Sequence, residues 1–441
     1  MSIEIGGGKE AEYGAEYLLQ ADFLVSGTGQ LNQPAYPDIT GLESFAGKIM
    51  HSARWDWGYS LRGKRVGIVG NGATAAQIVP EVAKECKDLV IFQRTANWII
   101  PRGDKSIGLL RRAVYSYFPL FRQRYRSRLM DIRESLYRAT YVPDTEEKDT
   151  IRRDCLQMME KQIPTNQRLR NQLTPSYPPG CKRVIVSDDY YPALNEAHVA
   201  LETRPISQIS SSGVRVGENG MQHDLDCLIL ATGFKTQNFL FPIKVYGRNG
   251  RSLPSIWQNG PQALCGTTVE SLPNFAMLYG PNTNLGHNSI ILMIEAQSRY
   301  INALITKLLQ AKSQGLTLVM SPEPQAVKEY NQWIQERLAK STFSDPSCNS
   351  WYKDNNGKVV NNWCGTVVEY QKMMSVVKWR SYEKHGSGAY LIDAEATDDL
   401  GRVVEESTRL RFVTDIAFVT CSITLAVAFL LQHLRFIIMD W

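Results

Sequence analysis

One segment, residues 64–86, constrains the fold of this chain more than any other. It reads KRVGIVGNGATAAQIVPEVAKEC. Residues 66–69 form a short apolar run typical of a buried parallel strand, and a glycine turn of the form G-x-G-x-x-A follows directly. A strand, such a turn and a helix make up the first half of a βαβ unit that binds a dinucleotide. The segment therefore predicts an α/β chain built on a parallel sheet.

The turn itself is the first predicted binding site. Gly70 would allow the tight turn, Gly72 a close approach of the backbone to a pyrophosphate, and Ala75 close packing of the helix on the strand. The first turn of the helix offers unpaired N–H groups and the positive end of a dipole to phosphate oxygens. The predicted cofactor-binding residues of the turn are Gly70, Asn71, Gly72, Ala73, Thr74 and Ala75. The alternative is a tight strand–helix turn that binds nothing.

The end of the next strand indicates which nucleotide binds. The sequence DLVIFQRT follows at residues 88–95, the distance expected of the next parallel strand. An acidic residue there would bind the ribose hydroxyls of NAD, whereas a cation would bind the 2′-phosphate of NADP. The chain has Arg94 followed by Thr95 and no acid, so we predict NADPH. A solvated arginine at a strand end is the alternative.

Composition excludes several other classes of protein. The chain has 441 residues, 43% of them hydrophobic and 21% charged, which fits two or three folded domains. The net charge of +5 is too mild to indicate nucleic-acid binding. No two of the eight cysteines are three apart, so the chain has no CxxC motif, and no metal site is predicted. The N-terminus has no secretion signal, so we expect unpaired cysteines in a reducing compartment.

Two further strand endings carry a Thr-Gly pair. DFLVSGTGQLNQP spans residues 22–34, with the pair at Thr28 and Gly29, and DCLILATGFKT spans residues 226–236. Such endings beside a dinucleotide domain are typical of flavoproteins with two dinucleotide domains, where they mark crossings between the domains. On physical grounds alone they are buried strands followed by turns.

The stretch FAGKIMHSARWD, residues 45–56, holds Phe45, Gly47, His51 and Trp55 at fixed intervals. It matches F-x-G-x-x-x-H-x-x-x-W followed by Pro or Asp, the fingerprint of flavin-dependent Baeyer–Villiger monooxygenases. The segments that resemble other parts of that family are GNGATA (70–75), FQRTANW (92–98), GCKRVIVSDDYYPALN (180–195) and GPNTNLGHNS (280–289). The chain thus resembles a member of the flavin-containing monooxygenase superfamily from about residue 22 to about residue 370.

The resemblance implies two cofactors, FAD and NADPH, bound by two interleaved Rossmann-like domains. It also implies a reaction in which NADPH reduces the flavin and dioxygen inserts one oxygen beside a ketone carbonyl. By the family match Arg183 is catalytic, Lys182 reaches the 2′-phosphate, and His51 couples nucleotide position to catalysis. The implied flavin-side residues are Thr28, Gly29, Asn284 and Gly286. A buried loop histidine with a packing tryptophan is the alternative for the fingerprint.

The chain departs from the family at its N-terminal end. Family members begin with a flavin-binding strand and a G-x-G-x-x-G turn, and the acidic partner of the active-site arginine lies there too. The residues ahead of Thr28 leave no room for that turn, and no buried strand precedes Gly6, so we expect an incomplete FAD domain. The leading function is oxidation of a ketone to an ester or lactone in natural-product biosynthesis, such as a fungal polyketide pathway. The alternatives are S- or N-oxygenation and a non-catalytic NADP-binding remnant.

Two helical segments complete the expected organisation. Residues 103–178, rich in Arg, Tyr and Leu, are expected to be an insertion with a solvated face, although such a basic surface could also contact membrane or RNA. Residues 416–434 carry no formal charge, so a helix over 413–439 is expected to anchor the chain in a membrane with its body cytosolic. A docked apolar helix is the alternative. The remaining expected parts are 1–50 (FAD-domain remnant), 51–102 and 179–225 (NADPH domain) and 226–400 (C-terminal part of the FAD domain).

Overall fold

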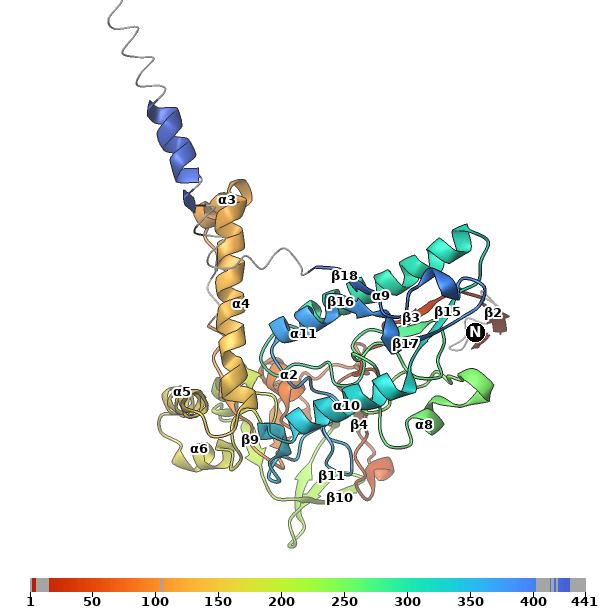
Figure 1. Ribbon diagram of the computed structural model, residues 1–441. Coiled ribbons are helices and arrows are strands. Elements are labelled where there is room, and N and C mark those ends of the chain that lie inside the picture. Colours follow the sequence, from red (N-terminus) through yellow and green to blue (C-terminus); the bar gives the residue numbers. More distant parts are fainter. Residues whose placement is uncertain are drawn as a thin grey trace, which may run out of the picture. The chain divides into compact units, whose positions relative to one another are not determined.

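The structure is a computed structural model that describes residues 2–4, 16–103, 106–401, 413, 416–417 and 419–428 (Figure 1). The chain divides into two compact units. The first comprises Met1–Arg102 and Tyr137–Leu400, and the second comprises Gly103–Leu136 and Gly401–Trp441. The predicted sites all fall in the first unit.

A parallel sheet of five strands forms the centre of the first unit. Its strands in spatial order are β4 (Lys48–His51), β13 (Cys227–Leu230), β5 (Arg65–Val69), β6 (Asp88–Phe92) and β9 (Val199–Glu202). The strands β5 and β6 confirm the predicted parallel pair, and α2 (Ala73–Ala83) begins directly after the glycine turn. Because all five strands run the same way, their carboxyl ends meet at one edge of the sheet.

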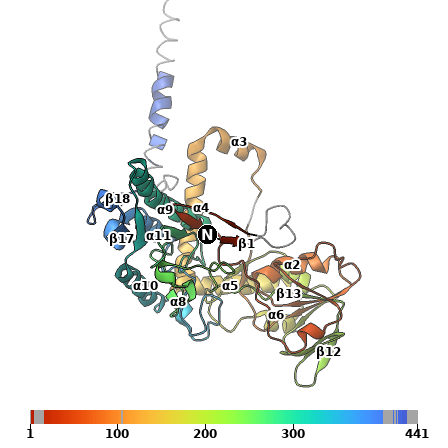
Figure 2. The same cartoon turned by 90° about the vertical axis from the view of Figure 1, so that its right-hand side faces the viewer.

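The two faces of this sheet are covered by different layers. Side chains alternate along β5, so that Val66 and Ile68 point to one face and Val69 to the other. The first face packs against α2, α5 (Glu146–Gln162), α6 (Gln167–Leu173) and α7 (Tyr190–Leu194). The second packs against an antiparallel sheet of β10 (Ile206–Ser210), β11 (Gly213–Val216) and β12 (Met221–Asp224). Figure 2 shows α2 and β12 on opposite sides of the parallel sheet.

Shorter sheets and further helices surround this core. Parallel pairs join β3 (Leu24–Ser26) to β14 (Phe275–Met277) and β7 (Ile99–Ile100) to β8 (Ile185–Val186). Antiparallel pairs join β1 (Ser2–Glu4) to β2 (Glu16–Leu18), β15 (Val319–Pro322) to β17 (Tyr382–His385), and β16 (Val376–Lys378) to β18 (Thr397–Asp399). The later helices are α8 (Leu253–Ile256), α9 (Ile290–Ser313), α10 (Pro324–Leu338) and α11 (Val367–Met374). Since β1 pairs antiparallel with β2, it is not the first strand of a parallel βαβ unit.

Helices make up most of the described residues between the strands β7 and β8. The stretch contains α3 (Leu109–Tyr117) and α4 (Pro119–Tyr141), followed by α5 and α6. Thr145 caps α5 by accepting a hydrogen bond from the backbone of Lys148, and three acidic residues lie in the first turn of that helix. An α/β fold with a helical insertion is therefore confirmed.

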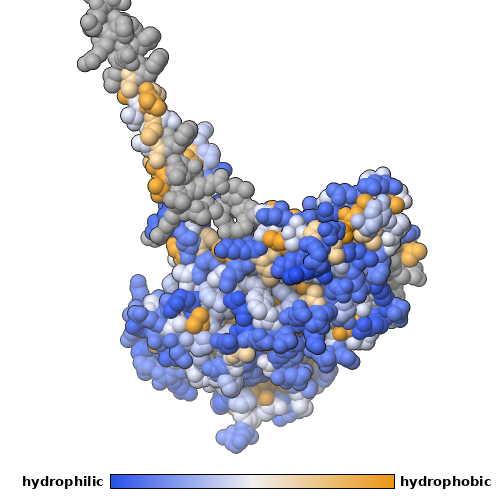
Figure 3. All heavy atoms as spheres, viewed as in Figure 1, coloured by the Kyte–Doolittle hydropathy of each residue, from blue (hydrophilic) through white to orange (hydrophobic). Residues whose placement is uncertain are grey.

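The expected membrane anchor is wrong. The described helical residues at the C-terminal end are 413, 416–417 and 419–428, and several expose apolar side chains (Figure 3). Across the described part of the chain, no helix combines the length and the apolar character needed to span a bilayer. The remainder of the expected 413–439 helix lies outside the described residues, and the membrane location inferred from it is withdrawn.

Candidate cofactor-binding site

The predicted glycine turn lies at the carboxyl end of β5, in the middle of the sheet. Gly70 has a φ of 105°, and a Cβ on it would lie 2.6 Å from the carbonyl oxygen of Ala231, so the position requires glycine. A Cβ on Gly72 would have no neighbour within 4 Å, which leaves open space at the N-terminus of α2. No side chain caps that helix, so its first N–H groups remain available to a ligand. Ala75 is fully buried, as close packing of helix on strand requires.

A hydrogen-bond network ties the turn to the segment that carries Arg94. Nδ2 of Asn71 donates to Oε1 of Gln93 at 2.7 Å and to the carbonyl of Thr95 at 2.9 Å. Nδ2 of Asn97 donates back to the carbonyl of Asn71 at 3.0 Å. The side chain of Asn71 therefore connects the glycine turn to the segment 93–95. The exposed Arg94 lies between the two residues that Asn71 binds, Gln93 and Thr95.

Lys182 and Arg183 follow the insertion and precede β8. Nζ of Lys182 lies 4.8 Å from the centre of the Tyr177 ring. Burial, and next the charge of Arg94, lower the pKa of Lys182, so these two cations are near enough to repel each other. Arg183 is exposed and donates from Nη1 to the carbonyl of Leu285 at 3.2 Å. Within the described residues, none of the three cations forms an ion pair with a carboxylate.

The fingerprint stretch contributes the edge strand β4. A Cβ on Gly47 would lie 2.6 Å from the carbonyl oxygen of Asp226, which explains the glycine. His51 ends the strand and is 1% exposed. Its Nδ1 accepts from the N–H of Ala53 at 3.1 Å, whereas its buried Nε2 forms no hydrogen bond of good geometry with the described residues, although the backbone of Gly233 is close enough to act against burial on its pKa. Burial lowers the pKa of His51, which therefore stays neutral with Nε2 as its donor. Trp55 packs on the helix-covered side of the core.

The two Thr-Gly crossings lie side by side. The N–H of Ala35 donates to the carbonyl of Gly233 at 2.9 Å, and the N–H of Lys235 donates to the carbonyl of Gln33 at 2.8 Å. The hydroxyl of Thr232 donates to the carbonyl of Ala35 at 2.6 Å. The sequence predicts each crossing by itself, but this pairing between them joins segments some two hundred residues apart and has no local signal.

Tyr279 brings the predicted flavin-side residues together. A Cβ on Gly29 would lie 3.9 Å from the Tyr279 ring, and the Tyr279 hydroxyl donates to Oδ1 of Asn284 at 2.8 Å. Asn284 is buried and also donates from Nδ2 to Oδ1 of Asn362 at 2.7 Å. Protein groups therefore already engage both ends of the Asn284 side chain. Thr28, by contrast, is exposed.

The later part of the same loop contacts the end of α4. The N–H of Gly286 donates to the buried hydroxyl of Tyr141 at 3.3 Å. Burial raises the pKa of Tyr141, so its hydroxyl remains protonated. The loop around Leu285 is thus bound by Arg183 at one residue and by Tyr141 at the next.

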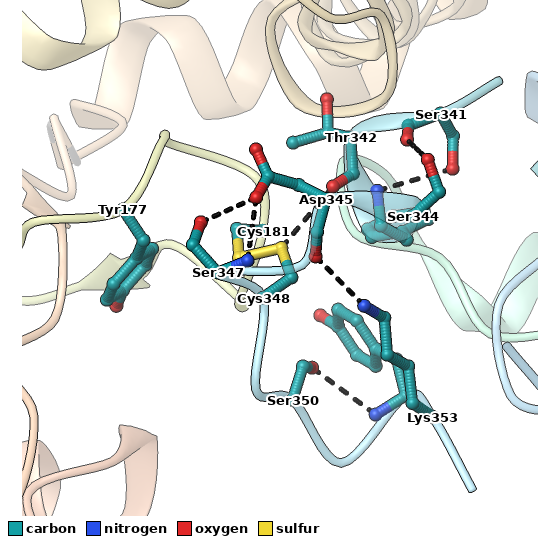
Figure 4. Close-up of a disulfide and its surroundings, with 12 residues drawn as sticks. Tyr177, Cys181, Ser341, Thr342, Ser344, Asp345, Ser347, Cys348, Ser350 and Lys353 are labelled. Atoms are coloured by element: carbon teal, nitrogen blue, oxygen red, sulfur yellow. Dashed lines mark hydrogen bonds between the residues drawn. A yellow bond between two sulfur atoms is a disulfide. The ribbon is translucent and has the colours of Figure 1, made fainter. Parts of the chain in front are cut away.

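One covalent link near the site was not expected. The structure joins Cys181 to Cys348, 167 residues away, with Cα atoms 5.3 Å apart (Figure 4). The expectation that the cysteines are unpaired is wrong for these two. Cysteine spacing alone cannot identify a pair among eight candidates. The bridge ties the residue before Lys182 to a loop in which Asp345 accepts from the N–H of Ser347 at 2.8 Å.

The residues present fit a bound NADP. They offer an open helix N-terminus, cations without carboxylate partners and the buried Nε2 of His51. On the flavin side, Oε1 of Gln30 is buried and has no hydrogen-bond partner among the described residues, as expected of a group that meets a polar ligand. The flavin-side sheet of the described residues is β3 with β14, and Leu24 of β3 is 41% exposed. A separate cavity of about 800 Å³ beside α10 and α11 is lined by none of the predicted site residues.

Comparison with known proteins gives the same assignment. Residues 17–245 match the family described as flavin-binding monooxygenase-like. The FAD-binding monooxygenase ktnD of Aspergillus niger is 47% identical over 407 residues, which cover 92% of this chain and 67% of that protein. A Baeyer–Villiger monooxygenase of Streptomyces coelicolor is 36% identical over 394 residues, covering 88% of this chain and 75% of that protein.

Solved structures agree on the fold. A steroid monooxygenase bound to NADP aligns with a TM-score of 0.67 and 26% identity, covering 80% of this chain and 72% of that one. A closed cyclohexanone monooxygenase aligns with a TM-score of 0.72 and 23% identity, covering 85% and 77%. The chain therefore belongs to the flavin-binding monooxygenase-like family, on its Baeyer–Villiger branch, whose members are NADPH-dependent enzymes with FAD and NADP as cofactors.

Proposed function

We propose that this chain binds NADPH across the carboxyl edge of the five-stranded sheet and oxidises a ketone to an ester or lactone. The observation that carries the proposal is the meeting of three segments at that edge: the glycine turn at 70–75, the Arg94 segment and Lys182. Tyr177 contacts two of these segments, since its hydroxyl donates to the carbonyl of Ala96 at 2.9 Å and its ring centre lies 4.8 Å from Nζ of Lys182. Two cations without carboxylate partners suit a phosphate dianion.

Each group has a separate task in holding the nucleotide. The turn Gly70, Asn71, Gly72, Ala73, Thr74 and Ala75 would receive the pyrophosphate at the N-terminus of α2. Arg94 would bind the 2′-phosphate through its planar fork, Thr95 through its hydroxyl, and Lys182 through a point charge. His51 would donate from Nε2 to the nucleotide or to a neighbouring group, such as the carbonyl of Gly233, which acts against burial on the pKa of the ring.

The second cofactor would lie on the side of Thr28, Gly29, Asn284 and Gly286. When bound, the flavin supplies electron transfer from NADPH to dioxygen. Arg183 would act on the reacting oxygen, since it reaches the flavin-side loop at Leu285. A fixed guanidinium stabilises negative charge on that oxygen without moving a proton, and closure around it excludes water.

The substrate class we propose is a natural-product ketone. The similarity to a fungal FAD-binding monooxygenase and to a Streptomyces enzyme supports this class. A polyketide intermediate is the form we favour. Within the chain, the division into an NADPH domain over 51–102 and 179–225, with flavin-side parts at 1–50 and 226–400, remains part of this proposal.

Arg183→Ala tests the function. Purified protein supplied with FAD, NADPH and a panel of ketones should form esters, and the variant should still oxidise NADPH but release hydrogen peroxide in place of ester. Arg183→Lys should restore little, because a point charge does not reproduce the planar fork. Arg168→Ala, at an exposed arginine of α6, is the matched control. Wild-type protein that binds NADP⁺ but takes up no FAD would favour the non-catalytic alternative instead, and full ester yield from Arg183→Ala would remove the catalytic role.

A further inference from the structure

Tyr177 contacts both segments that carry the proposed phosphate cations. Its hydroxyl donates to the carbonyl of Ala96 at 2.9 Å and lies 3.2 Å from Oδ1 of Asn97, two and three residues after Arg94. The face of its ring meets Nζ of Lys182 at 4.8 Å from the ring centre, within the range of a cation–π interaction. One side chain, 3% exposed, therefore contacts two segments that lie about 85 residues apart in sequence.

Tyr177 is itself held in place. Its carbonyl accepts from Nε1 of Trp98 at 2.8 Å. Three residues later, Gly180 has a φ of 90°, and a Cβ on it would lie 2.3 Å from the carbonyl oxygen of Thr140, so the turn runs tightly against the end of α4. Cys181 then joins Cys348, and Figure 4 shows Tyr177 near that bridge. The segment 177–181 is thus fixed at three points, and Tyr177 offers a rigid support.

A neutral aromatic ring is the right partner for this lysine. Burial and the charge of Arg94 both disfavour the charged form of Lys182, and the Tyr177 ring, 4.8 Å from Nζ, favours it. A carboxylate would do so by forming an ion pair, but it would also repel the incoming phosphate. The ring of Tyr177 attracts the ammonium group and adds no net charge, so the full charge of Lys182 stays available to a ligand.

We propose that Tyr177 is a positioning residue for recognition of the 2′-phosphate: its ring places Lys182 and its hydroxyl places the segment that carries Arg94. The inference rests on the proposed assignment of those two cations. It adds a residue that touches neither the nucleotide nor the flavin in the proposed site and that sets the preference for NADP over NAD.

Binding of NADP⁺ and NAD⁺ by calorimetry tests the two parts of the tyrosine separately. Tyr177→Phe removes the hydroxyl and keeps the ring, and should weaken NADP⁺ binding about two- to tenfold. Tyr177→Leu also removes the ring and should weaken it further, by about another two- to tenfold. Binding of NAD⁺ should change by less than about twofold in either variant, because NAD⁺ carries no 2′-phosphate. Tyr190→Phe is the matched control, since Tyr190 is equally buried but its hydroxyl has no hydrogen-bond partner among the described residues.

A double-mutant cycle shows whether the ring acts through the lysine. In a Lys182→Met background, the step from Tyr177→Phe to Tyr177→Leu should no longer change NADP⁺ binding. Equal weakening of both nucleotides by Tyr177→Phe would overturn the inference and leave a general packing role. If Lys182→Met and Arg94→Ala lower the preference for NADP⁺ while both Tyr177 variants keep it, the cation assignment stands and the positioning role fails. If the two cation variants also keep it, the underlying assignment fails.

Discussion

Replacing Arg94 by alanine should change nucleotide preference without disturbing the fold. The side chain is exposed, and within the described residues it has no ion pair or side-chain hydrogen bond, so the melting temperature should hardly move. A charge-assisted phosphate contact contributes about 1.5–3 kcal/mol, which corresponds to about 12- to 160-fold in the dissociation constant of NADP⁺. NAD⁺ lacks the 2′-phosphate, so its binding should stay within about twofold.

The structure adds a second, independent readout for the same variant. Arg94 helps to lower the pKa of Lys182, so its removal should let that pKa rise toward its usual value, although burial will still hold it down. NMR of the reductively ¹³C-methylated lysine would report the shift, and calorimetric titration would give both dissociation constants. Arg62→Ala, at an exposed arginine ahead of β5, is the control. An equal loss of affinity for both nucleotides, or an unmoved Lys182 pKa, would refute the reasoning.

Two more predictions concern the stability of the fold at Gly70 and at His51. Gly70→Ala should lower the free energy of unfolding by about 2–4 kcal/mol, because a left-handed backbone and a Cβ close to the Ala231 carbonyl both oppose the new side chain. Gly63→Ala is the control, since φ is also positive there but a Cβ meets nothing within 4 Å, and it should lower the free energy of unfolding by about 1 kcal/mol. Similar losses for the two variants in urea unfolding would contradict the steric argument. Burial lowers the pKa of His51 below 6.5, so on acidification the unfolded chain takes up that proton first, and stability should fall from about pH 6.5 downward until the folded pKa is passed. His51→Asn should remove this part of the pH dependence. If the melting temperature of the variant falls from pH 8 to pH 5 as steeply as that of the wild type, His51 does not cause the loss of stability.

Local patterns predicted the centre of the fold well. The apolar runs before Gly70 and Arg94, and the glycine turn between them, identify β5, α2 and β6, because a strand, a turn and a helix each depend on neighbouring residues. The sequence identified the fingerprint at residues 45–56, but it did not predict that part of this stretch forms a strand of the sheet. Residues 48–51 form the edge of the sheet only because β13 pairs with them, and that partner lies far along the chain.

The residues that hold the cofactor-binding segments in place were harder to predict than the cofactor-binding residues themselves. Tyr177 bonds to residues about eighty positions earlier, and Cys181 to one 167 positions later, so no window of sequence contains both partners. The prediction for the C-terminal segment was wrong for a different reason. Its composition alone suggested a membrane helix, but no helix among the described residues is long and apolar enough to span a bilayer.

The place of β13 in the sheet also affects how the chain is made. β4 and β5 are complete by residue 69, yet the strand that separates them is synthesised only at residues 227–230, about 8–30 s later at ordinary translation rates. Until then β4 and β5 each have a free edge, and as neighbours in sequence they can pair directly with each other. Insertion of β13 must displace any such pairing, so this late, long-range step governs when the sheet can close. A nascent chain shorter than about 230 residues therefore exposes unpaired strand edges that chaperones can bind, and the five-stranded sheet can be completed only after β13 has left the ribosome.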